Sequence, residues 1–261
     1  MRCSKGVKFR FTPLYLLKGK SAMKFYVYNL RHRNKNIIKL LAFLAVFSVV
    51  FILLFRDNNK DTDLAVFNPI QNVSTDKEIY SITASLDGSA QLTDFRTFLD
   101  VANGLNVKIT FFVSENFFNG NVDTIKEIMK YSHEVGYLIE KDTSAMNRTD
   151  AMRYLAKLND NFYKKCGKYP KYIRYVNEKD KAGQLFGVMA AFGQYNIAEG
   201  RYGKAEAGSL VDIGRIDGTS SAKLITVVTE AVNAKLTSVS LKDLLYNVDI
   251  PADTAGTQGP G

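Results

Sequence analysis

The chain has 261 residues, a length that allows one or two domains, and a formal net charge of +9. Residues 1–39 contain eleven of its 35 basic residues and no acidic one, so the remainder holds 24 basic and 26 acidic residues, a charge of −2. This nearly neutral remainder excludes a folded domain with the basic surface that nucleic-acid binding requires, and we expect no nucleic-acid partner.

The segment 37–55 predicts a transmembrane helix. Its nineteen residues are apolar except for Lys39 and Ser48. As a helix they would extend about 28 Å, close to the hydrocarbon thickness of a bilayer. Lys39 lies near the end of the segment, where its long side chain can reach the headgroups. A cleaved signal peptide is the alternative, but no small-residue cleavage site follows Phe55, so an uncleaved signal-anchor is favoured.

Flanking charges predict how this helix is oriented in the cell membrane. Arg31, Arg33 and Lys35 precede it without any acidic residue, whereas basic and acidic residues are mixed in the segment that follows it. Under the positive-inside rule, residues 1–36 form a cytoplasmic tail and the C-terminal part lies outside the membrane. We therefore expect a single-pass membrane protein with an extracytoplasmic domain. Met1 and Met23 both remain candidate starting residues.

The chain beyond the membrane segment divides into a linker, a domain and a tail. Residues 56–76 are polar and typical of a linker, residues 77–248 form the predicted domain, and residues 249–261 have the low apolar content of a flexible tail. Within the domain, strands are predicted at 79–85, 107–113, 137–139, 172–176, 210–213 and 237–241, and helices at 93–103, 122–131, 150–166, 181–192 and 222–234. This alternation predicts an α/β fold with a mainly parallel sheet, in the form of a distorted (β/α) barrel.

Five segments of the predicted domain resemble, in order, the motifs of the polysaccharide deacetylase (NodB-homology) family. They are TASLDG at 83–88, VKITFFV at 107–113, HEVG at 133–136, GKYP at 167–170 followed by Arg174, and TSVSLKDLL at 237–245. Members of this family are metal-dependent enzymes that remove N- or O-acetyl groups from glycans. The resemblance implies a barrel of the glycoside hydrolase/deacetylase type, with a glycan groove at the C-terminal ends of its strands.

The residues that carry the chemistry of this family are mostly replaced in this chain. The family binds a zinc-like metal through one Asp and two His, a set suited to polarising a carbonyl and activating a water molecule. Asp87 matches the metal-binding Asp, but the two His positions fall at Leu138 and Asp142. The catalytic base, an Asp in the family, corresponds to Leu86. The resemblance is therefore to a degenerate member of the family.

The two histidines of the chain do not restore this set. His32 falls in the cytoplasmic tail, and His133 matches a family position that shapes a turn and binds no metal. The general-acid His of the family should fall near Gly214–Arg215, where the chain has no histidine.

Asp87 and Arg174 are the candidate residues of the substrate groove. In the family, the arginine that matches Arg174 pairs with the catalytic Asp; without that Asp, we expect Arg174 to pair with Asp87 or Glu178. No resident cofactor is expected. As an alternative, Asp87 and Asp142 could hold a hard divalent cation if Glu140 or water completed the shell.

Three functions are consistent with this combination of scaffold and site. The first is a catalytically silent, deacetylase-like domain that binds a cell-envelope glycan or an envelope protein. The second is an active carbohydrate deacetylase with an atypical metal site, which would hydrolyse a non-peptide carbon–nitrogen bond or an ester bond. The third is a structural spacer tethered to the membrane.

Overall fold

Strand β2 (Ile79–Leu86) is the longest strand of the sheet and is buried on both faces. The structure, a computed structural model, describes residues 68–176, 184–200 and 202–260. Around β2 the sheet runs in the order β6-β5-β4-β3-β2-β7, and every neighbouring pair is parallel. The other strands are β3 (Ile109–Ser114), β4 (Glu134–Ile139), β5 (Tyr172–Tyr175), β6 (Tyr195–Asn196), β7 (Leu210–Arg215) and β8 (Thr237–Ser238), which pairs with the start of β2.

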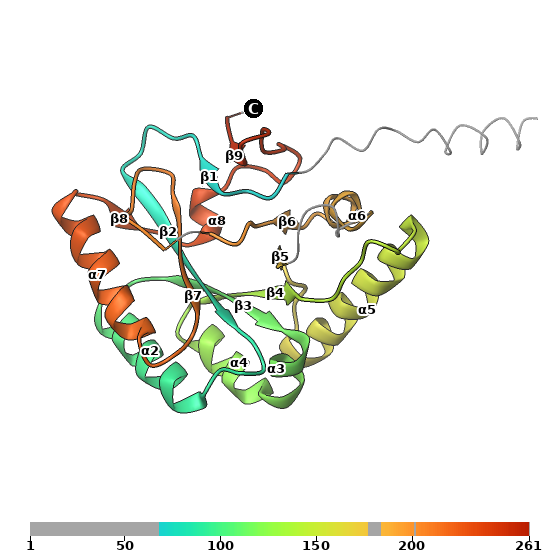
Figure 1. Ribbon diagram of the computed structural model, residues 1–261, viewed down its shortest axis with the longest axis horizontal. Coiled ribbons are helices and arrows are strands. Elements are labelled where there is room, and N and C mark those ends of the chain that lie inside the picture. Colours follow the sequence, from blue (N-terminus) through green and yellow to red (C-terminus); the bar gives the residue numbers. More distant parts are fainter. Residues whose placement is uncertain (1–67, 177–183, 201, 261) are drawn as a thin grey trace, which may run out of the picture. The chain divides into compact units, whose positions relative to one another are not determined.

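The strands alternate with helices, most of which cover one face of the sheet. The helices are α2 (Leu92–Gly104), α3 (Glu115–Gly120), α4 (Val122–Lys130), α5 (Arg148–Cys166), α6 (Leu185–Ala191), α7 (Ser220–Asn233) and the short α8 (Leu241–Leu244). Figure 1 shows α2, α3, α4, α5 and α7 along one side of the sheet, with α8 on the other. The predicted alternation of strands and helices around a parallel sheet is confirmed.

The two faces of β2 belong to different environments because successive side chains of a strand point in opposite directions. Tyr80, Ile82, Ala84 and Leu86 pack with side chains of the covering helices in the larger apolar core. A smaller apolar cluster fills the inner side of the curved sheet; it includes Phe112, Leu138, Tyr172, Leu210 and Leu241.

The sheet forms an open half-barrel. The predicted parallel, curved sheet is confirmed, but the predicted barrel is not closed. Among the described residues, no strand pairing joins the edge strands β6 and β7. Residues 68–74 lie across this opening. The Ile70 amide donates to the carbonyl of Asn196 in β6, and the Val73 amide donates to the carbonyl of Gly208, which precedes β7, both at 2.8 Å. We call residues 68–74 the strap.

The strap corrects the predicted boundary between linker and domain. Residues 56–76 were expected to form a linker, but Ile70 and Val73 are buried in the inner cluster, and β1 (Asn72–Val73) is part of the strap. The polar composition of this segment concealed these two apolar anchors. The domain therefore begins no later than residue 68.

The predicted flexible tail is also wrong for residues 249–260. Its strand β9 (Thr257–Gln258) pairs in parallel with β1, and Gln258 is fully buried. The Gln258 amide donates to the carbonyls of Asn247 and Ile250 and accepts from the Tyr246 amide. Low apolar content predicted disorder, but one satisfied buried amide and a strand pairing fix this segment instead.

Several predicted elements have different bounds in the structure. β4 begins at Glu134, earlier than expected, because the segment 134–136 pairs with β3. The last predicted strand, 237–241, is a two-residue strand followed by α8.

The described part of the chain contains no helix long and apolar enough to cross a bilayer. The predicted transmembrane segment 37–55, the tail 1–36 and Glu178 all lie outside the described residues.

His133 lies at the start of β4 and is buried against the larger core. Its Nδ1 accepts a hydrogen bond from the Ile109 amide at 3.2 Å, and its ring meets the edge of Phe111. This geometry requires a neutral imidazole with its proton on Nε2. Burial and the charge of Lys108 lower the pKa of His133 to about 4. The expected role as a structural residue of the turn agrees with this position.

Replacing Gly208 with Ala should destabilise the domain. A Cβ at Gly208 would overlap the carbonyl oxygen of Val73 in the strap, and the φ of +75° is strained for any residue with a Cβ. We expect the free energy of unfolding to fall by about 2–3 kcal/mol, measured by urea denaturation. Gly203→Ala is the matched control, since a Cβ there would meet no atom within 4 Å. Equal stability of both variants would contradict the position of the strap.

The buried His133 should make the stability depend on pH. Between pH 4 and 6.5 the unfolded chain binds a proton on this histidine that the folded chain excludes. The stability that the protein gains by burying a neutral His133 is therefore complete above about pH 6.5. As the pH falls toward 4, the free energy of unfolding should decrease by about 2–3 kcal/mol. Urea denaturation across this range tests the effect. In His133→Asn, whose amide oxygen can still accept from Ile109, this part of the pH dependence should disappear; an unchanged profile would contradict the assignment.

Candidate functional site

Leu86 and Asp87 follow one another at the carboxyl end of β2 and point to opposite sides. Leu86 is fully buried in the core beneath the helices. Asp87 continues the inner row of Ser81, Thr83 and Ser85. The position expected for a catalytic base therefore holds an apolar side chain that also faces away from Asp87.

Asp87 is held by a local turn and by one cation. Its Oδ1 accepts from the amide of Ser89 at 2.8 Å and from the hydroxyl of Ser89 at 2.5 Å. Its Oδ2 lies 2.7 Å from Nη1 of Arg215. Burial by itself raises the pKa of the Asp87 carboxyl, but the hydrogen bonds from Ser89 and the charge of Arg215 outweigh it, and the pKa lies below its ordinary value. The carboxylate is thus ionised at neutral pH.

A β-bulge brings Arg215 to Asp87. β7 advances by three residues, from Asp212 to Arg215, while β2 advances by two, and Gly214 adopts a φ of +84° within the extra length. Such bulges redirect the side chains that follow them. Arg215 then points to Asp87 and also lies 3.6 Å from Glu140, which follows β4. The sequence analysis noted only that no histidine stands at this position. It did not predict that Arg215 pairs with Asp87.

The two other expected metal-ligand positions are Leu138 on β4 and Asp142 in the loop that follows it. Leu138 is buried in the inner cluster and offers no donor atom. Asp142 lies in an exposed turn, where its Oδ1 accepts from the Ser144 amide at 2.9 Å. Within residues 68–176, 184–200 and 202–260, no group of three or more His, Cys, Asp and Glu side chains is arranged to hold a metal ion. The residues present do not fit the zinc-like metal of the family.

Arg174 is paired with a residue that the sequence had not indicated. Its Nη1 lies 3.0 Å from Oδ2 of Asp212 on β7, and both side chains are almost completely buried. Its Nη2 donates to the hydroxyl of Thr83 at 2.8 Å, and its guanidinium lies 4.1 Å from the ring centre of Phe112. The predicted pairing of Arg174 with Asp87 is therefore wrong; Arg215 takes that place. The other predicted partner, Glu178, lies outside the described residues.

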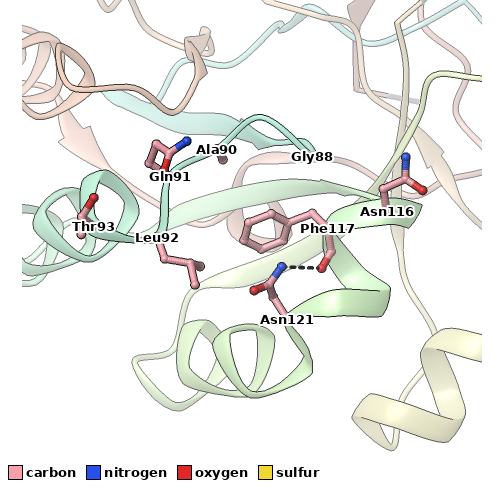
Figure 2. Close-up of a pocket in the computed structure, with 8 residues that line it drawn as sticks. All are labelled: Gly88, Ala90, Gln91, Leu92, Thr93, Asn116, Phe117 and Asn121. Carbon is pink, nitrogen blue, oxygen red and sulfur yellow. Dashed lines mark hydrogen bonds between the residues drawn. The ribbon is translucent and has the colours of Figure 1, made fainter.

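A pocket of about 490 Å³ opens beside Asp87, at the carboxyl ends of β2 and β3. Figure 2 shows its lining, which comes from the loop before α2, the first two residues of α2, and α3 with its C-cap: Gly88, Ala90, Gln91, Leu92, Thr93, Asn116, Phe117 and Asn121. The lining has no charged side chain. Its amides and hydroxyl offer hydrogen-bond donors and acceptors for a neutral ligand. The volume lies in the range of small-molecule sites.

Breaking the Arg174–Asp212 pair should strongly destabilise the protein. Arg174→Met leaves the buried Asp212 carboxylate without its cation, which costs about 3–5 kcal/mol of unfolding free energy. The double variant Arg174→Met with Asp212→Asn removes both charges and should recover part of that loss. Chemical denaturation of the wild type, the two single variants and the double variant forms the cycle. A double variant as unstable as the sum of its single variants would contradict a direct pairing.

Comparisons with known proteins identify the fold but no close relative. No protein-family model and no curated protein sequence matches the chain. Solved structures do match. A family 4 carbohydrate esterase from Bacillus anthracis is 20% identical, with a TM-score of 0.56 over 70% of this chain and 90% of that one. A chitin deacetylase from the fungal pathogen Colletotrichum lindemuthianum is 18% identical, with a TM-score of 0.53 over 70% and 93%.

Members described as inactive match as well as the enzymes do. A family 4 pseudoenzyme from Bacillus anthracis is 14% identical, with a TM-score of 0.57 over 75% of this chain and 74% of that one. A mutant of that pseudoenzyme with restored enzymatic activity has a TM-score of 0.58 at 15% identity. These likenesses concern the fold alone. The chain therefore has the fold of the family 4 carbohydrate esterases, the polysaccharide deacetylase fold that its motifs predicted and that enzymes and pseudoenzymes share.

Proposed function

We propose that this chain is a single-pass membrane protein whose outer domain no longer deacetylates and instead binds a cell-envelope glycan. The apolar segment 37–55 and the basic residues before it support the anchored topology. Protease added to intact cells should then digest the domain and leave the N-terminal tail; digestion only after permeabilisation would contradict this orientation.

The ion pair between Asp87 and Arg215 is the main observation that supports the proposed loss of catalysis. A metal at the carboxylate of Asp87 would meet the guanidinium already 2.7 Å from it, and the two positive charges would repel each other. Leu138, at another predicted ligand position, cannot ligate a metal. Hydrolysis of an acetyl group needs both an electrophile at the carbonyl and a group that accepts the proton of water. Leu86 cannot accept that proton.

The pocket beside Asp87 supports glycan binding. Gln91, Thr93, Asn116 and Asn121 can exchange hydrogen bonds with sugar hydroxyls, and Phe117 contributes an apolar wall. A neutral pocket suits a neutral sugar better than a charged ligand, because no fixed charge would need to be compensated. An envelope protein is the alternative partner, and a deacetylase with a metal on Asp87 and Asp142 is the alternative activity.

The test uses the full-length chain in detergent with a tetramer of N-acetylglucosamine and added Zn²⁺. We expect no acetate above the blank, no bound metal by elemental analysis, and binding by calorimetry. Gln91→Ala combined with Asn116→Ala should weaken binding about tenfold, because two hydrogen-bonding groups are lost. Asn233→Ala, which removes an exposed amide at the end of α7, is the control.

Each other outcome identifies a different function. Acetate release that disappears in Asp87→Ala would overturn the proposal in favour of the atypical metal site. Absence of glycan binding, with a phenotype for the pocket variant in cells, would indicate a protein partner. Absence of both would indicate a structural spacer.

A further inference from the structure

We infer that the domain carries a second binding site, for an acidic glycan, at the end of the sheet opposite to Asp87. A pocket of about 440 Å³ lies at the amino ends of β4 and β5. Its lining includes Glu134 and Tyr172, the first residues of these strands. Asp87 follows the carboxyl end of β2, and in a parallel sheet the two ends of the strands face opposite ways. This site is therefore separate from the proposed glycan pocket and does not depend on it.

Three exposed lysines give this pocket a positive charge. Lys168 and Lys171 come from the loop between α5 and β5, and Lys242 comes from α8. None of the three forms a salt bridge within the described part of the chain. Cations that no carboxylate of the domain neutralises are available to an anionic ligand.

The single acidic residue of the lining is used internally. Glu134 accepts from the hydroxyls of Tyr172 at 3.1 Å and Thr110 at 2.8 Å, and from the Leu241 amide at 2.8 Å. Its carboxylate therefore joins β3, β4, β5 and α8 beneath the pocket. Because these donors satisfy the Glu134 carboxylate, it does not form ion pairs with the lysines. The three lysines and one glutamate give the lining of the pocket a net charge of +2.

Exposed aromatic rings stand beside the lysines. Tyr169 is 62% exposed, and Phe192, after α6, is 39% exposed. Tyr169 stacks on Tyr163 of α5, with ring centres 4.8 Å apart and planes 21° apart. A ring that is held flat and open to solvent can receive the apolar C–H face of a sugar ring, while its polar edge hydrogen-bonds. The stacking also lowers the entropy that the ring would lose on binding.

Together these features favour a sugar chain that bears carboxylate or phosphate groups. Lysines provide point charges for such anions, and the rings distinguish a sugar from a bare anion. A lipid surface would also attract lysines and aromatic rings, but this site is concave, with the volume of a ligand pocket, and a bilayer surface cannot enter it.

The test titrates the full-length chain in detergent with three probes: a trimer of galacturonic acid, a trimer of galactose, and glycerol 1-phosphate. We expect the acidic trimer to bind at least about tenfold more tightly than either other probe, and less tightly at high salt. Lys168→Gln combined with Lys171→Gln should weaken it about tenfold, and Tyr169→Ala about fivefold. Lys130→Gln combined with Lys157→Gln, two exposed lysines of α4 and α5, is the control with the same loss of charge.

Four outcomes would overturn this inference. They are equal binding of the acidic and neutral trimers, equal weakening by the control variant, binding of glycerol 1-phosphate as tight as that of the trimer, and no binding of any probe. The variant at Gln91 and Asn116 should bind the acidic trimer like the wild type. Failure of the neutral pocket and failure of the lysine pocket can thus be told apart.

Discussion

The buried pair of Arg174 and Asp212 constrains the curvature of the whole sheet. Arg174 lies on β5 and Asp212 on β7, and three strands stand between them. In a flat sheet, strands four places apart would be about 19 Å from each other, beyond the reach of an arginine and an aspartate. A separation of 3.0 Å therefore requires the sheet to curl around the pair. Thr83, on β2, accepts from the same guanidinium, so three strands meet at one charge.

This constraint explains how the scaffold can persist although Leu86 and Leu138 stand where the family has a catalytic base and a metal ligand. Arg174 and Asp212 hold the inner face together without either Leu86 or Asp87, so replacement of catalytic positions leaves the curvature intact. Arg215 plays a different part. It is half-exposed and pairs with Asp87, whose position matches the metal-binding Asp of the family. A guanidinium supplied by the chain then balances the buried charge of Asp87, which would otherwise be costly.

Sequence reasoning predicted the features that depend on local pattern. Periodicity located β2, β3, α2 and α4, and the order of motifs predicted the fold family. Sequence reasoning failed where a few contacts between residues far apart in the chain determine the structure. The strap is polar except for two buried side chains, and the C-terminal segment is fixed by the hydrogen bonds of Gln258. The pairing of Arg174 with Asp212 depends on curvature across four strand positions, and that of Arg215 with Asp87 depends on a bulge; neither has a signature in sequence spacing.

The pockets at the two ends of the parallel strands differ in charge. At the carboxyl ends, the amides and Phe117 form a neutral pocket beside a balanced ion pair. At the amino ends, a satisfied glutamate supports three uncompensated lysines and exposed rings. If both proposals hold, a glycan that contains neutral and acidic sugars is recognised at each end through a different chemistry. Under the proposed function, in which the domain does not cleave its ligand, affinity is distributed over two pockets and no reactive geometry has to be preserved.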